Sequence, residues 1–295
     1  MIPLDKDLQT TKCDLEEFGK ITRRVLQYLP NVVSSFEEKN NYRIYSSTIA
    51  GTKKYIRPIN KTLFIESEHE FSEKFTEFKT ILESIKTKHP ISENEKQTID
   101  STIYTIQQSI GAGLDLLVNP NSARKHVGNR FEELIKSIFT EIGISNKKVV
   151  LKIPYETEEG IKTYKCENDL ILSPFEKVQS SSDMLHKQEV VVSVKTTSKD
   201  RMAKMFIDKM LLEKFIGHPQ KVIGIFLNDV QRKGSDNTSF TLVSGLFMVY
   251  SKFLTELEGV YYLDPPPAVR KKPFSDYMNT FSELITKDIG LLLSS

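Results

Sequence analysis

Two charged residues stand at the ends of apolar runs in the middle of the chain. Asp169 lies in the run CENDLILSP, directly before Leu170 and Ile171, and Lys195 follows the run VVVSV. If the two runs pair as neighbouring strands, both charged groups emerge at one end of the sheet. A carboxylate and a lysine placed together in this way can hold a hydrated divalent metal ion against a phosphate.

Hydrolysis of a phosphodiester needs a metal ion, oxygen ligands for that ion, and a cation beside the attacking water. Asp169 would bind the ion and Lys195 would orient the water. Because Mg²⁺ keeps several of its waters, one further acid is expected but not a full protein cage. An ordinary surface ion pair explains the same two residues equally well.

The segment after the second apolar run decides between these readings. It runs from Lys195 to Arg201 and reads KTTSKDR. Here the sequence resembles the PD-(D/E)xK restriction endonucleases, within them the branch of EcoRII, PspGI and NgoMIV, which recognise CCGG or CC and GG around a central base pair. The resemblance implies a Mg²⁺-dependent nuclease in which Lys195 is catalytic and Lys199, Asp200 and Arg201 read the C·G pairs.

The acid two residues before the catalytic lysine in the common family motif is missing, since Ser193 stands there. The resembled branch supplies that acid from the helix after the lysine, which points to Asp208, with Glu213 further along. The branch also has a glutamate four residues after a glycine on an upstream helix, which points to Glu132. The resemblance therefore implies a site of Asp169, Lys195, Asp208 and Glu132, with the three acids as candidate metal ligands.

The residues that would read DNA have chemistry suited to it. Arginine forms two parallel hydrogen bonds to guanine, lysine donates as a point charge, and aspartate accepts from cytosine. Asp200 could instead be a helix cap, because an acid is favoured at a helix N-terminus. Arg124 and Lys125, just before the Glu132 helix, are expected to contact phosphates.

Hydrophobic periodicity divides the chain into two parts. Residues 1–118 are expected to be a helical region for dimerisation or DNA contacts, with a first helix that Pro30 ends and a later break at Gly111 and Gly113. Residues 119–295 alternate strands and helices and include a hairpin at Glu158–Gly160. This pattern predicts an α/β nuclease core, a mixed β-sheet flanked by helices, as the resemblance also implies.

Composition limits the other possibilities. Apolar runs are too short to cross a membrane, no secretory signal begins the sequence, and a cytoplasmic protein is expected. Cys13 and Cys166 fit no metal or redox motif, and no phosphate-binding glycine loop predicts a nucleotide cofactor. A net charge of +2 leaves any role in nucleic-acid binding to local residues.

The sequence thus predicts a type II restriction endonuclease that cuts double-stranded DNA at a palindrome with a CCGG or CCNGG-like core. A palindrome calls for two active sites related by a twofold axis, hence a homodimer or a higher homo-oligomer. Two alternatives stay open. One is a structure-selective or repair nuclease of the same fold, and the other, which Ser193 allows, is a catalytically silent DNA-binding protein.

Overall fold

The computed structural model describes residues 2–49, 51–199, 201–234, 237–242 and 244–294. The helices are α1 (Leu4–Gln9), α2 (Leu15–Val32), α3 (Glu68–Lys86), α4 (Glu93–Leu117), α5 (Pro120–Glu141), α6 (Met202–Ile216), α7 (Ser244–Phe253), α8 (Phe281–Glu283) and α9 (Ile289–Ser294), with short turns η1 (Pro267–Arg270), η2 (Phe274–Asp276) and η3 (Leu284–Asp288). The strands are β1 (Ser35–Lys39), β2 (Tyr42–Ile49), β3 (Thr52–Tyr55), β4 (Ile59–Asn60), β5 (Ser145–Thr157), β6 (Gly160–Ser173), β7 (Val190–Lys195), β8 (Lys221–Asn228), β9 (Val230–Lys233), β10 (Asn237–Phe240), β11 (Gly259–Asp264) and β12 (Met278–Thr280). None of the described helices is long and apolar enough to cross a membrane.

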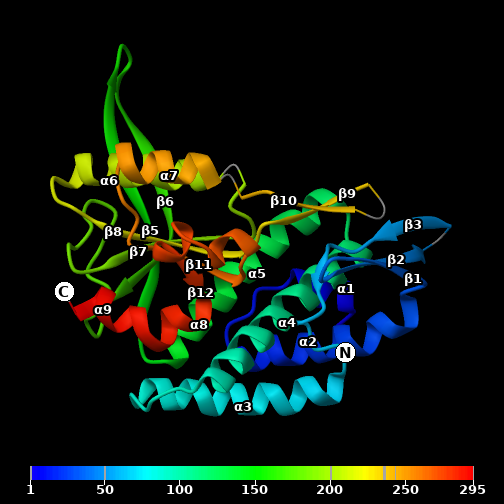
Figure 1. Cartoon of the computed structure of the whole chain (residues 1–295). Coiled ribbons are helices and arrows are strands. Elements are labelled where there is room, and N and C mark those ends of the chain that lie inside the picture. Colours follow the sequence, from blue (N-terminus) through cyan, green and yellow to red (C-terminus); the bar gives the residue numbers. More distant parts are fainter. Residues whose placement is uncertain (1, 50, 200, 235–236, 243, 295) are drawn as a thin grey trace.

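A mixed sheet forms the centre of the second half of the chain, as predicted (Figure 1). Its strand order is β12-β11-β8-β7-β6-β5. Strands β7, β8, β11 and β12 are parallel to their neighbours in that group, whereas β5, β6 and β7 pair antiparallel. The far ends of β5 and β6 project from the body as a long hairpin, the one expected at Glu158–Gly160.

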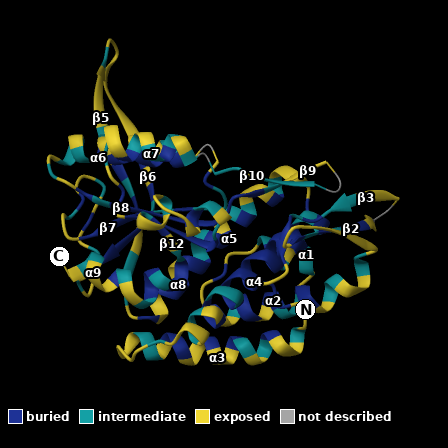
Figure 2. Ribbon diagram, viewed as in Figure 1, coloured by how far each residue is buried: buried dark blue, intermediate teal, exposed yellow. Residues whose placement is uncertain are grey.

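Helices cover both faces of this sheet. Val190, Val192 and Val194 point into a hydrophobic cluster shared with α4 and α5, whereas Val191 points into a second cluster formed with α6 and α7. The alternation follows the two-residue period of a strand that is buried on both faces. In Figure 2 the strands of the sheet are mostly buried, whereas the helices on either face are exposed on their outer sides.

The first half of the chain was expected to be helical, and this is only partly right. Helices α1 to α4 are present, but residues 35–60 form a small antiparallel sheet of β1, β2, β3 and β4. In β2, Tyr42, Ile44 and Ser46 are buried while Arg43 and Tyr45 are not. That two-residue period is the strand signal that the helical interpretation overlooked.

Two expected helix ends are also wrong. Pro30 lies inside α2, which continues to Val32. Gly111 and Gly113 lie inside α4, which continues to Leu117. A Cβ on Gly111 would come within 2.4 Å of the Arg57 guanidinium carbon, so this glycine admits a close neighbour and does not break the helix.

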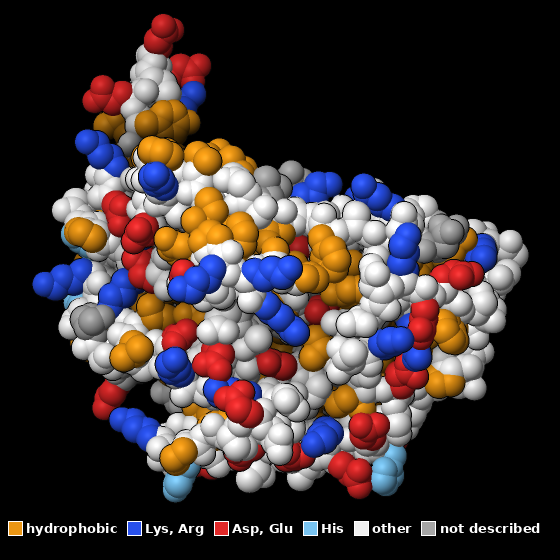
Figure 3. All heavy atoms as spheres, in the orientation of Figure 1, with side chains coloured by type: hydrophobic (Ala, Val, Ile, Leu, Met, Phe, Trp, Pro, Cys, Tyr) orange, Lys and Arg blue, Asp and Glu red, His pale blue; other side chains and the backbone are white. Residues whose placement is uncertain are grey.

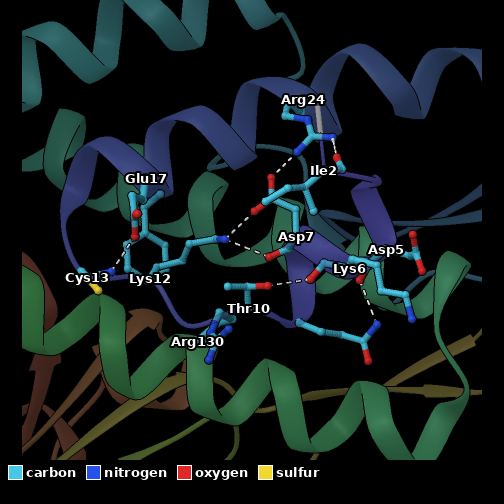
Figure 4. A network of polar contacts seen from close by, with 12 residues as sticks. Ile2, Asp5, Lys6, Asp7, Thr10, Lys12, Cys13, Glu17, Arg24 and Arg130 are labelled. Atoms are coloured by element: carbon cyan, nitrogen blue, oxygen red, sulfur yellow. Dashed lines mark hydrogen bonds and ion pairs between the residues drawn. The ribbon is translucent and has the colours of Figure 1, made fainter.

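The start of the chain is tied to the helix that carries Glu132. Asp7 pairs with Lys12 and Arg24 (Figure 4), and the backbone N–H of Lys12 donates to Glu133 Oε2 at 2.9 Å. Glu133 also accepts from Arg130, one turn earlier on α5, at 2.5 Å. Hydrophobic contacts join the same parts, since α1 to α5 share one cluster with the central sheet. The boundary at residue 118 stays a prediction.

A buried carboxylate joins the small sheet to the central sheet. Asp264, at the end of β11, is 3% exposed and accepts hydrogen bonds from Tyr42 Oη at 2.9 Å and Asn60 Nδ2 at 2.8 Å. Burial raises the pKa of this carboxyl to about 6, although both hydrogen bonds act in the opposite direction. The folded protein therefore holds a proton here at a pH where the unfolded chain has lost it.

This pKa predicts a pH-dependent stability. A raised carboxyl pKa favours folding at low pH, and the contribution is lost as pH rises from about 4 through about 6. The full change is on the order of 3 kcal/mol. In chemical denaturation at pH 4.5 and 7.5, Asp264→Asn should therefore gain stability relative to the wild type on going to the higher pH. A constant difference between the two proteins would contradict the assignment.

Candidate active site

The site begins where β6 separates from β7. The ladder between these strands runs from Leu172 opposite Val190 to Leu170 opposite Val192, and Asp169 is the next residue. On the other side of β6 the register with β5 shifts at this point, because Lys147 pairs with Ile171 and Val149 pairs with Asn168. Two residues of β6 thus oppose one of β5, which is a β-bulge at Asp169 and Leu170.

The bulge changes which face the side chains occupy. Cys166 and Ile171 both lie in the hydrophobic cluster formed with α6 and α7 although they are five positions apart, and an unbroken strand would place them on opposite faces. The extra residue absorbs this mismatch and lets Asp169 turn toward the diverging strand β7. Bulges often re-aim a side chain in this way beside functional sites.

Asp169 accepts hydrogen bonds from β7 beyond the point where the β6–β7 ladder ends. Its Oδ2 accepts from the backbone N–H of Val194 at 2.9 Å and from Lys195 Nζ at 2.5 Å. The side chain of Asp169 is only 10% exposed, and that of Lys195 is 28% exposed. The predicted pair is therefore brought together where β7 ends, in a partly buried position.

Glu132 approaches the same pair from α5. Its Oε1 lies 3.5 Å from Lys195 Nζ, and its Oε2 lies 3.8 Å from Lys148 Nζ, on the β5 side of the bulge. Burial and the charge of Asp169 raise the pKa of Glu132, while the two lysines partly offset them. Lys148 was missed from the sequence because only the bulged register places it here.

Asp208 faces the site from α6. A cavity of about 300 Å³ opens beside Asp169 and Lys195, and Asp208 and Arg201 line it as well. Both Asp208 oxygens contact Lys204 Nζ, at 2.6 and 2.5 Å. Although burial lowers the pKa of Lys204, the hydrogen bond to Asp208 and the negative charge of that carboxylate together outweigh it, and the pKa is raised. Three carboxylates, those of Glu167, Asp169 and Asp208, thus line the cavity among the described residues, and the last two are each held by a lysine.

The positions of Ser193 and Glu213 bear on which residue supplies the acid that is missing two positions before Lys195. Ser193 lines the cavity at the place where the common motif has its acid, and its side chain supplies no carboxylate. Glu213 is directed elsewhere, since its Oε1 accepts from the backbone N–H of Gln220 at 3.0 Å and lies 3.9 Å from Lys209 Nζ. Asp208 therefore faces the cavity, while Glu213 fastens the end of α6.

The donor set suits a hydrated Mg²⁺ ion better than a closed metal cage. Among the described residues no group of three acids, histidines or cysteines is placed to enclose a metal. Asp169 Oδ1 has no hydrogen-bond donor among the described residues, and Asp208 lies on the same cavity. Mg²⁺ is commonly held by one or two carboxylates and keeps several waters. The residues present fit that mode of binding.

A solved structure has a fold similar to that of this chain. The type IIP restriction endonuclease Kpn2I superposes with a TM-score of 0.71 at 19% identity, covering 95% of this chain and 91% of that one. The chain has a type II restriction-endonuclease-like fold. The PspGI complex with substrate DNA matches at a TM-score of 0.40 and 13% identity, over 76% of this chain and 92% of that one. No family model and no curated protein matches the sequence.

The segment predicted to read DNA lies between β7 and α6, and we call its described residues the recognition turn. Lys199 is exposed and its Nζ lies 3.4 Å from Gln231 Oε1 on β9. Arg201 is exposed at the start of α6 and lines the active-site cavity. Asp200 lies outside the described residues. Arg124 and Lys125 are exposed on the first turns of α5.

One buried carboxylate that the sequence analysis missed holds this turn in place. Asp229, 0% exposed, accepts from Thr197 Oγ1 at 3.0 Å and from the N–H and Oγ of Ser198 at 2.8 and 2.6 Å. Tyr262 Oη donates to the same carboxylate at 2.8 Å, and Thr241 Oγ1 lies at 3.4 Å. An acid after the strand FLN was the available signal. We call this set of contacts the Asp229 anchor.

Loss of the Asp229 anchor should loosen the recognition turn. In Asp229→Asn an amide nitrogen would face hydroxyl and amide donors, which leaves buried groups unpaired and should cost about 2–4 kcal/mol of stability. Chemical denaturation measures this loss, and hydrogen exchange at the amide of Ser198 should become faster. The exposed Asp276→Asn is the matched control. Unchanged exchange at Ser198 would show that the turn is held without the anchor.

Proposed function

We propose that the chain is a Mg²⁺-dependent type II restriction endonuclease. It would hydrolyse both strands of double-stranded DNA at a palindromic site with a CCGG or CCNGG-like core. The observation that carries the proposal is the contact of Asp169 with Lys195 on a cavity that Arg201 also lines. Chemistry and base reading would then take place side by side.

The residues divide the work as follows. Asp169 orients Lys195, so that its ammonium group sits beside the attacking water and stabilises negative charge as it develops on the phosphate. Asp169 and Asp208 would hold Mg²⁺ through their carboxylates, with Glu132 as the further acid near Lys195. A bound Mg²⁺ ion polarises the phosphate and lowers the pKa of a water. Partial burial strengthens each of these charge interactions.

The chain would act on a palindrome as a homodimer or a higher homo-oligomer. Each copy supplies one cavity, and a twofold axis presents the two cavities to the two strands. Arg201 and Lys199 are the exposed donors next to the cavity and would read guanine. Arg124 and Lys125 would contact phosphates from α5.

The catalytic assignment predicts that Asp169→Ala and Lys195→Ala each abolish cleavage of plasmid DNA in Mg²⁺, because each removes half of the central contact. Binding of the cognate duplex in Ca²⁺ should be largely kept, since neither residue is proposed to read bases. Wild-type digestion with Mg²⁺, its loss with EDTA, and mapping of the cut ends define the activity. Asp183→Ala and Lys187→Ala, both exposed and outside the cavity, are the matched controls.

Asp208→Asn and Glu132→Gln in the same assay separate the two further acids. The larger loss, accompanied by a higher Mg²⁺ requirement, identifies the ligand. Ordinary cleavage by the Asp169 or Lys195 variant would remove that residue from the mechanism. Cognate binding by a wild type that never cuts would point to a silent DNA-binding protein.

The specificity assignment predicts a selective loss in Arg201→Ala. A lost bidentate contact to guanine costs about 1–3 kcal/mol of discrimination. The variant should therefore lose affinity for a duplex with a CCGG or CC-N-GG core, yet bind a scrambled duplex almost as before. Competitive binding in Ca²⁺ at fixed salt measures both, with the exposed Arg270→Ala as control. Equal losses on the two duplexes would reassign Arg201 to a phosphate.

A further inference from the structure

A hairpin that the proposed mechanism does not use lies directly beside the recognition turn. Strand β9 starts one residue after Asp229, and β10 pairs with it antiparallel. Lys199 of the turn contacts Gln231 of β9 at 3.4 Å, and Thr241, just after β10, donates its N–H to the backbone oxygen of Asp229 at 2.8 Å. The hairpin and the recognition turn are therefore held by the same residue.

The other side of this hairpin packs against the small N-terminal sheet. The guanidinium carbon of Arg232 lies 4.6 Å from the ring centroid of Tyr55 on β3, and Lys53 Nζ lies 5.2 Å from the same centroid. The rings of Phe240 and Tyr42 meet edge to face at 6.1 Å between centroids. Side-chain contacts thus link the recognition turn to β9 and β9 to β3, and β9 and β3 lie at the same end of the molecule in Figure 1.

Positive charge gathers on this surface without acidic partners. We call Lys53, Lys199, Arg232 and Lys233 the basic strip; all four are exposed, and none forms an ion pair with a carboxylate among the described residues. In the same small sheet, by contrast, Arg43 and Lys61 both pair with Glu38. Lys and Arg side chains line the upper edge of the molecule over β9 and β10 in Figure 3.

Two features make the strip suited to an extended anion. Lys53 and Arg232 share one tyrosine ring, so cation–π contacts hold two like charges within roughly 10 Å of each other, with no counter-charge among the described residues. The electrostatic repulsion between the two cations is reduced when a negative group binds near both of them. The row continues to Lys199, beside the residues proposed to read bases.

We propose that the basic strip binds the phosphates of duplex DNA outside the recognition sequence. The proposal rests on the proposed function, because it places the duplex over the active-site cavity and lets it continue across β9 toward β3. Contacts of this kind position the duplex and carry no sequence information. The N-terminal sheet would thereby take part in DNA binding through Lys53 and Tyr55, which holds Arg232 in place.

The test is the salt dependence of duplex binding in Ca²⁺. Each phosphate contact contributes about 0.9 to the slope of log K against log salt. Arg232→Ala and Lys53→Ala should each lower the slope by about that amount, on cognate and scrambled duplexes alike, and the double variant by about twice as much. Lys79→Ala is the matched control: this lysine also lies over an aromatic ring, that of Phe75, but it pairs with Glu16 on the opposite side of the molecule in Figure 1.

Two further measurements keep the outcome interpretable. Arg232→Lys keeps the charge and should restore most of the slope, whereas a purely structural role of the arginine would not be rescued. A cognate duplex trimmed to the recognition sequence should bind wild type and Arg232→Ala equally well. Slopes in both single variants equal to those of wild type and Lys79→Ala would overturn the proposal. Failure of the proposed function has a different signature, which is absence of cleavage in Mg²⁺ whatever the slopes are.

Discussion

The backbone N–H of Val194 is the group on which the geometry of this site depends. Where β6 leaves β7, that N–H loses its partner strand, and a buried amide without an acceptor is costly. Asp169 supplies the acceptor with the same oxygen that holds Lys195. The cavity opens where the two strands separate. Asp169, which accepts the hydrogen bond of the unpaired Val194 N–H there, is also the carboxylate proposed to take part in catalysis.

A single carboxylate also holds the turn between β7 and α6. Lys195 ends the strand, Arg201 precedes the helix, and Asp229 after β8 holds Thr197 and Ser198 between them. Because β7 and β8 are parallel neighbours, their ends lie at one edge of the sheet, so Asp229 can reach the turn. The contacts of Asp229 thus hold the part of the chain that joins the proposed catalytic lysine to the proposed recognition donors.

The parts that the sequence predicted are those that depend on local pattern. Apolar runs located β6 and β7, and the charges at their ends gave Asp169 and Lys195. Helical spacing located α5, and the family resemblance pointed to Glu132 on it. The bulge could not be predicted, because it depends on the register between β5 and β6 and not on either strand alone. The family resemblance pointed to Asp208 with Glu213 further along, and the packing of α6 places Asp208 on the cavity and Glu213 away from it. The position of Lys148 follows from the register, which is a tertiary property.

The N-terminal region is held to the rest of the molecule by buried polar contacts as well as by apolar packing. Asp264 receives hydrogen bonds from Tyr42 and Asn60, and Glu133 receives the N–H of Lys12. Because such contacts are directional, they fix orientation where hydrophobic contact alone permits sliding. The small sheet thus keeps a defined place relative to β9 and the recognition turn. A surface that crosses from one part to the other can therefore bind a stiff duplex without first being assembled.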